Sequence, residues 1–186
     1  MNGDDAQALL FGEALACQEV RPASFVPGVF DAVAAQADSL HAETFLQAIA
    51  VVEDGRSEDP DEHGPTTLAL NRIESKLDLL TILVGALLQG SDRDPPRKLR
   101  WSALGACLAD VPPLAPGTTG HFRIQPSDWL PQALRLPAVV LASPEGADAG
   151  QLWLRFENLS PGLETALERH LFRVHRREIA ERRRPK

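Results

Sequence analysis

Ser102, which follows Trp101, could be imagined as a nucleophile, and the chain contains no tyrosine. A serine hydroxyl attacks a substrate only when a neighbouring base takes its proton. The five histidines are scattered, and His170 and His175 are five residues apart, which puts them on different faces of a helix. The motifs GxSxG and HExxH and the phosphate-binding pattern GxxxxGK are absent. We therefore assign no catalytic residue, interpret Ser102 as structural and expect a protein that is not an enzyme.

Metal-binding side chains are also present, but without the spacing that a metal site requires. Glu58, Asp59, Asp61, Glu62 and His63 lie close together in the sequence. They lack the DxDxDG spacing of a calcium loop, so the segment is predicted to be a solvated linker. The cysteines at positions 17 and 107 belong to no CxxC pair and are interpreted as small buried hydrophobic residues. No metal or cofactor is expected.

Charge is distributed unevenly along the chain, whose net charge is −7. Residues 1–66 hold thirteen Asp and Glu against two Arg, whereas residues 169–186 hold seven Arg and one Lys against two Glu. The basic residues that could meet nucleic-acid phosphates are Arg173, Arg176, Arg177 and Arg182 to Arg184. The acidic remainder of the chain repels phosphate, so a solvated helix end is the preferred interpretation and nucleic acid is disfavoured as a partner.

The stretch from Thr66 to Gly90 is the element around which the rest of the chain is organised. Its apolar residues follow one another at spacings of three and four, the heptad pattern of a helix that buries a seam. The a and d positions are Leu70, Ile73, Leu77, Leu80, Val84 and Leu87. Leucine at a with isoleucine at d favours trimers and tetramers. We predict that this helix assembles several copies of the chain; the alternative is one buried helix within a single domain.

The residues before the heptad stretch are predicted to be helical. Ala6 to Val20 is rich in alanine and leucine and predicts a short helix, followed by a break at residues 21–23. A second helix is predicted from about Pro27 to Val52, where apolar residues recur at helical spacing. Asp54 to Pro65 is acidic and contains proline and glycine, so it predicts a loop between two antiparallel helices.

After Gly90 the pattern changes to short strands bounded by proline and glycine turns. Residues 99–108 alternate with a change of phase near Gly105, which we interpret as one strand with a bulge. Further strands are predicted at residues 121–124, 134–141 and 152–156. Ser160 as N-cap and Pro161 at the first helical position predict a final helix. Its buried stripe is predicted to contain Leu163, Leu167, Leu171 and Val174, with Ala166 and His170 beside it.

These elements predict an α+β protein in which N-terminal helices, including the heptad helix, precede a small antiparallel barrel or sandwich and a C-terminal helix. The predicted division is residues 1–65, a helical region with an acidic linker; 66–90, the oligomerisation helix; and 91–186, the β-domain. The longest apolar run, Ile82 to Leu88, is too short to cross a bilayer, and acidic residues near the N-terminus do not match a secretion signal. A cytoplasmic location is expected.

The order of elements from residue 93 to 180 resembles the PilZ domain of bacteria. Ser102 to Leu108, SALGACL, is similar to the family pattern SxxG followed by an apolar strand, and Leu114 to Gly117 is similar to the turn that comes next. The resemblance implies a six-stranded antiparallel barrel. In typical members it also implies a receptor for cyclic di-GMP that uses an RxxxR stretch and a (D/N)xSxxG stretch.

The hypothesis that the chain is a receptor assigns cyclic di-GMP binding to Arg93, Arg97, Arg100, Ser102 and Gly105. Guanidinium forks suit phosphates and guanine edges, while serine and glycine let a ligand approach the backbone. Arg100, however, stands where typical members carry Asp or Asn, and two prolines separate Arg93 from Arg97. We interpret the motif as degenerate and keep the receptor as the alternative function.

The heptad helix ahead of the barrel is similar to that of atypical PilZ proteins, which form tetramers and do not bind the dinucleotide. This resemblance implies a homo-oligomeric adaptor, with a tetramer expected, that acts through protein contacts in type IV pilus function, motility or virulence. The expected partner is a protein of the pilus or of the cyclic di-GMP signalling machinery, and its identity is left open.

Overall fold

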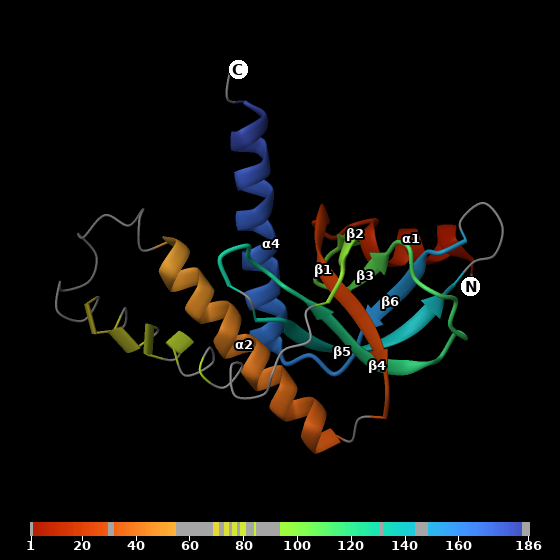
Figure 1. Cartoon of the computed structure of the whole chain (residues 1–186), viewed down its shortest axis with the longest axis horizontal. Coiled ribbons are helices and arrows are strands. Elements are labelled where there is room, and N and C mark those ends of the chain that lie inside the picture. Colours follow the sequence, from red (N-terminus) through yellow and green to blue (C-terminus); the bar gives the residue numbers. More distant parts are fainter. Residues whose placement is uncertain are drawn as a thin grey trace.

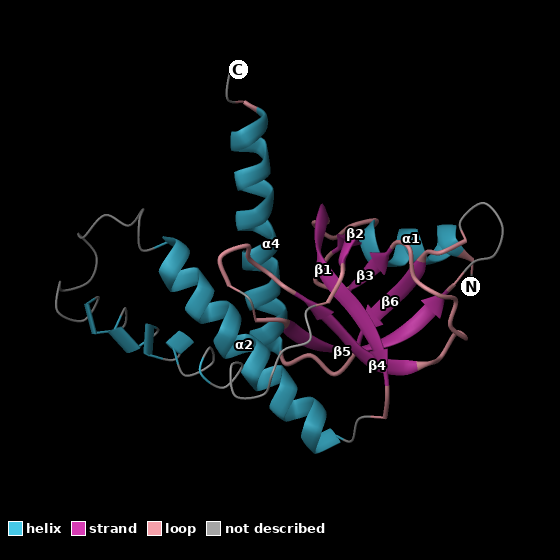
Figure 2. Cartoon of the chain, viewed as in Figure 1, coloured by secondary structure: helices cyan, strands magenta, loops and turns pink. Residues whose placement is uncertain are grey.

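Six antiparallel strands form a closed barrel in the computed structural model, which describes residues 2–29, 32–54, 94–130, 132–143 and 149–183 and isolated positions between 69 and 84. Helices α2 and α4 cover one side of the barrel, and α1 lies against strands β5 and β6 (Figures 1 and 2). The helices are α1 (Gly3–Phe11), α2 (Ala32–Asp54) and α4 (Pro161–Arg182). The strands are β1 (Cys17–Pro27), β2 (Pro96–Trp101), β3 (Gly105–Leu108), β4 (Thr119–Ile124), β5 (Leu134–Ala142) and β6 (Leu152–Phe156). The barrel predicted from the family resemblance is therefore confirmed.

The barrel closes through β1, in the order β1-β2-β3-β6-β5-β4. The first half of β1 pairs with β2, from Cys17 to Pro22, and its second half pairs with β4, from Ala23 to Pro27. Pro22 stands where the strand changes partner. Proline has no N–H to donate to a ladder and is therefore best tolerated where pairing is interrupted.

The strand β1 corrects the prediction that the N-terminal third is helical. The predicted helix from Ala6 to Val20 is replaced by the shorter α1, which ends at Phe11, and residues from Cys17 onward belong to the barrel. The second predicted helix is confirmed, although α2 begins at Ala32 because Pro27 still belongs to β1. Pairing with β2 and β4 thus overrides a local composition that favours helix. The division at residues 65 and 90 stays a prediction, although one barrel strand comes from its first part.

The segment from residue 99 to 108 is two strands and not one bulged strand. Trp101 ends β2 and pairs with Ala106 of β3, and the backbone N–H of Ser102 donates to the carbonyl oxygen of Gly105 at 2.9 Å. The change of alternation near Gly105 therefore marks a tight hairpin. We call residues Ser102–Gly105 the SxxG turn below.

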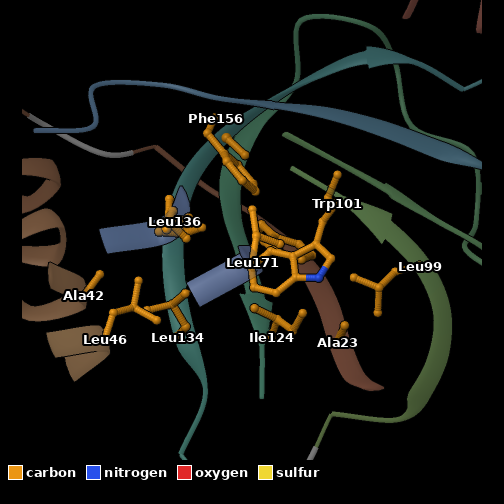
Figure 3. Packing of buried hydrophobic residues seen from close by; sticks show 14 of the residues in the cluster. Ala23, Ala42, Leu46, Leu99, Trp101, Ile124, Leu134, Leu136, Phe156 and Leu171 are labelled. Atoms are coloured by element: carbon orange, nitrogen blue, oxygen red, sulfur yellow. The ribbon is translucent and has the colours of Figure 1, made fainter. Parts of the chain in front are cut away.

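The main hydrophobic core fills the barrel and continues between the barrel and its helices. Trp101, Leu99 and Ile124 point inward from the strands, and Leu46 of α2 and Leu171 of α4 lie at the helix-covered side (Figure 3). Ser160 accepts a hydrogen bond from the N–H of Leu163 at 3.1 Å, which confirms the predicted start of α4. The predicted α4 stripe is buried as expected.

Candidate functional site

The first candidate surface is the apolar face of the heptad segment. Every described position between residues 69 and 84 is helical. Five of the six predicted seam residues are described and are 53–60% exposed in the single chain, although all are apolar: Leu70, Ile73, Leu77, Leu80 and Val84. Leu87 lies outside the described residues. Leu79, which falls on a different face of the helix, is 7% exposed and joins the main core. The described part of the segment thus packs on its own chain through Leu79, while its described heptad positions are exposed.

The second candidate site is the SxxG turn, whose polar groups make contacts within the chain. The Ser102 hydroxyl donates to the carbonyl oxygen of Leu10 at 2.8 Å and accepts from the N–H of Leu104 at 3.1 Å. Ser102 is completely buried. A Cβ at Gly105 would lie 2.1 Å from the carbonyl oxygen of Leu154 and 2.8 Å from Cδ2 of Leu10. Glycine is needed there because β6 and α1 approach the turn so closely.

The two described arginines of the predicted motif, Arg97 and Arg100, make different contacts within the chain. Arg97 donates through a terminal guanidinium nitrogen to the carbonyl oxygen of Asp110. Arg100 points outward from β2, and its guanidinium carbon lies 4.6 Å from the centre of the Phe11 ring. Such a cation–π contact favours this position of the side chain. Arg93 lies outside the described residues.

Helix α1 is the element that sequence reasoning did not connect with this motif. Its last two residues, Leu10 and Phe11, contact Ser102, Gly105 and Arg100. Leu10 and Phe11 are themselves buried in a second apolar cluster that includes Trp153 of β6. The described residues that the receptor hypothesis assigns to a ligand, Arg97, Arg100, Ser102 and Gly105, are therefore in contact with α1, β6 or a neighbouring loop.

A buried histidine, His170, lies on the side of α4 that faces the core. His170 is 1% exposed, and its ring centre is 5.8 Å from a ring of Trp101. Burial, reinforced by the positive charge of Arg173, lowers the pKa of His170 from 6.5 to about 4. The signal in the sequence was its position, three residues after Leu167 and four before Val174, within the apolar stripe.

The basic residues of α4 are partly neutralised by carboxylates. Glu53 of α2 lies 3.6 Å from Nε of Arg173 and 3.1 Å from a terminal nitrogen of Arg177, measured from its Oε2. Arg182 pairs with Glu178 one turn earlier. Arg184 lies outside the described residues. Several of the arginines considered for nucleic-acid contact thus stabilise the fold.

Cys17 does not resemble a reactive thiol. Cys17 is buried, its thiol donates to the carbonyl oxygen of Leu171 at 3.4 Å, and burial raises its pKa to about 11. Cys107 is only partly buried, which corrects the expectation that both are core residues. Among the residues that the structure describes, no group of three or more His, Cys, Asp or Glu could hold a metal ion. In the same part of the chain, no helix has both the length and the apolar character needed to span a bilayer.

The closed antiparallel barrel, with the SxxG turn joining β2 to β3 and a helix following β6, defines a PilZ-type domain. The family model described as "Atypical PilZ domain, cyclic di-GMP receptor" matches residues 46–184. The chain belongs to this atypical PilZ family.

Solved structures include a similar protein over nearly the whole chain. It is a pathogenic protein from Xanthomonas campestris, described as a new tetrameric PilZ domain self-assembled via an unusual helical bundle. The two sequences are 42% identical, the alignment covers 96% of this chain and 97% of the other, and the TM-score is 0.73. No curated protein matches the chain.

Proposed function

We propose that this protein is a non-enzymatic, homo-oligomeric PilZ-type adaptor that acts through protein contacts. The observation that carries the proposal is the uncovered heptad face, where Leu70, Ile73, Leu77, Leu80 and Val84 are each more than half exposed. A continuous apolar seam at heptad spacing is the surface that helices bury against one another in a bundle. Copies of the chain assemble through this seam, and the barrels are presented outward as binding modules.

The similar structure from Xanthomonas campestris supports a tetramer as the form of assembly. It is described as tetrameric and self-assembled through a helical bundle, and it is 42% identical to this chain. Four barrels on one bundle give avidity, because each contact after the first is made within the same complex. The description of that relative as a pathogenic protein supports a role in virulence. We extend the proposal to type IV pilus function and motility, in the cytoplasm, on the basis of family resemblance.

The assembly is tested by replacing Leu77 and Leu80 together with aspartate. Burying two carboxylates in an apolar seam is strongly unfavourable, so the variant should sediment as a single chain or aggregate. The matched control is Val20→Asp, because Val20 is an apolar residue of similar exposure that lies on β1 and outside the heptad segment. The control should keep the mass of the wild-type complex. A double variant with the same mass as the wild type would refute assembly through this seam.

The second candidate function is a cyclic di-GMP receptor, which the description of the matching family names. The contacts of Arg100, Ser102 and Gly105 with α1 support the degenerate interpretation, because a ligand at this turn would have to displace Leu10 and Phe11. Titration calorimetry with the dinucleotide separates the two functions. Micromolar binding that is lost in Arg97→Ala would make the receptor the leading function, whereas no measurable heat supports the adaptor.

A further inference from the structure

A groove of about 910 Å³ lies between α4, the SxxG turn and the segment after α1. In Figure 1, α4 stands beside the barrel and its C-terminal half extends past the strands. Residues of α4 between Glu168 and Arg176 line the groove. The lining residues that matter here are Leu15, Leu104, Arg169, Phe172 and Arg176. This surface is separate from the heptad seam and from the buried Ser102 hydroxyl.

Three large apolar side chains from different parts of the chain line this groove. Leu15 is 39% exposed, Leu104 is 49% exposed and Phe172 is 54% exposed. The backbone of Leu104 is fixed at both polar groups, because its N–H donates to the Ser102 hydroxyl and its carbonyl oxygen accepts from the N–H of Phe156 at 3.0 Å. A preformed apolar surface loses little conformational entropy when a partner covers it. Exposed apolar residues gathered in a groove indicate an interaction site.

Two uncommitted positive charges line the groove on α4. Arg169 and Arg176 are exposed and form no ion pair with any carboxylate among the described residues. The third arginine of the groove, Arg173, already lies 3.6 Å from Glu53. The guanidinium of Arg176 is 5.9 Å from the Phe172 ring, so charge and apolar surface are adjacent. The two uncommitted arginines are seven positions apart in the sequence, which places them two turns, or about 10 Å, apart along the helix axis.

The groove also carries negative charge, and the position of that charge limits which partner segments could bind there. Glu168 precedes Arg169 on α4, and successive residues are turned by about 100° around a helix. Phe172 therefore lies between Glu168 on one side and the pair Arg169 and Arg176 on the other. A complementary partner carries an apolar stripe with carboxylates along one edge only, because a uniformly acidic segment would meet Glu168 and Glu13.

We propose that this groove docks an amphipathic helix of a partner protein. The apolar stripe of the partner helix covers Leu15, Leu104 and Phe172. Two carboxylates along one edge of that stripe, two turns apart, pair with Arg169 and Arg176. A helix laid in an apolar groove is a recurring mode of peptide recognition. The inference rests on the proposed adaptor function and names the surface through which the barrel reaches its protein partner.

The test uses helical peptides displayed on phage and selected on the full-length chain. The enriched peptides should carry apolar residues at spacings of three and four and acidic residues seven apart. Their Kd, measured by fluorescence anisotropy, should rise at least about tenfold on Phe172→Ser and on Arg176→Glu, as expected for central contacts. The control is Arg183→Glu, which makes the same charge change on an exposed arginine directly after the end of α4, outside the groove, and should leave Kd unchanged.

A second arm exchanges the charges. Peptides with lysine in place of the two acidic residues should bind Arg169→Glu/Arg176→Glu better than they bind the wild type. No enrichment, or peptides that bind Phe172→Ser and Arg176→Glu as tightly as the wild type, would overturn the inference. Sedimentation of the same samples reports the assembly separately. If the variants form intact oligomers and bind the peptides as tightly as the wild type, only the groove proposal is refuted. If the wild type sediments as a monomer, only the assembly proposal is refuted.

Discussion

His170 allows a pH effect to be worked out from the structure. The imidazole is 1% exposed, and neither ring nitrogen has a hydrogen-bond partner among the residues that the structure describes. Its pKa falls from 6.5 to about 4 because burial disfavours the charged ring and the nearby guanidinium of Arg173 adds to this effect. The neutral form is therefore the one that fits the folded chain.

The sign of the effect follows from this lowered pKa. Below pH 6.5 the histidine of the unfolded chain binds a proton while His170 of the folded chain does not, so acid favours unfolding. With a pKa of 6.5 for this histidine in the unfolded chain and about 4 in the folded chain, the free energy of unfolding falls by about 2 kcal/mol at pH 5 and by about 3 kcal/mol at pH 4. Well above pH 6.5 His170 is neutral in both the folded and the unfolded chain, so the effect disappears.

The assay compares urea denaturation of the wild type and His170→Leu at pH 7.5, 5 and 4, at one chain concentration. Leucine fits an apolar site and cannot titrate, so the free energy of unfolding of the variant should gain on the wild type by about 2 kcal/mol at pH 5. Other titrating groups are common to both proteins and cancel in this difference. A difference that stays constant with pH would refute the neutral, buried histidine.

Two further substitutions test contacts described above. Gly105→Ala places a Cβ 2.1 Å from the backbone oxygen of Leu154 and should cost about 2–3 kcal/mol, lowering Tm in a thermal scan; Gly28→Ala, which meets nothing within 4 Å, is the control and should leave Tm nearly unchanged. Glu53→Gln removes the charge opposite Arg173 and should cost about 1–2 kcal/mol in urea denaturation, less in 1 M salt; a loss that does not depend on salt would contradict an electrostatic role.

The sequence by itself determined the elements whose signals are local. Ser160 and Pro161 predicted the start of α4, and the alternation of apolar and polar residues predicted β4, β5 and β6. These patterns can be recognised in the sequence because capping and alternating burial depend on neighbours only a few residues away. The heptad spacing likewise predicted an apolar face, and the structure leaves its described residues exposed.

Only the tertiary structure decided the role of the N-terminal residues. Cys17–Pro27 becomes a strand because β2 and β4 offer it partners, although Pro22 interrupts its local pattern. Ser102 is satisfied by the carbonyl oxygen of Leu10, ninety-two residues earlier in the chain. Contacts between such distant residues are set by the closing of the barrel and not by local spacing, so no pattern around Ser102 records that α1 covers it.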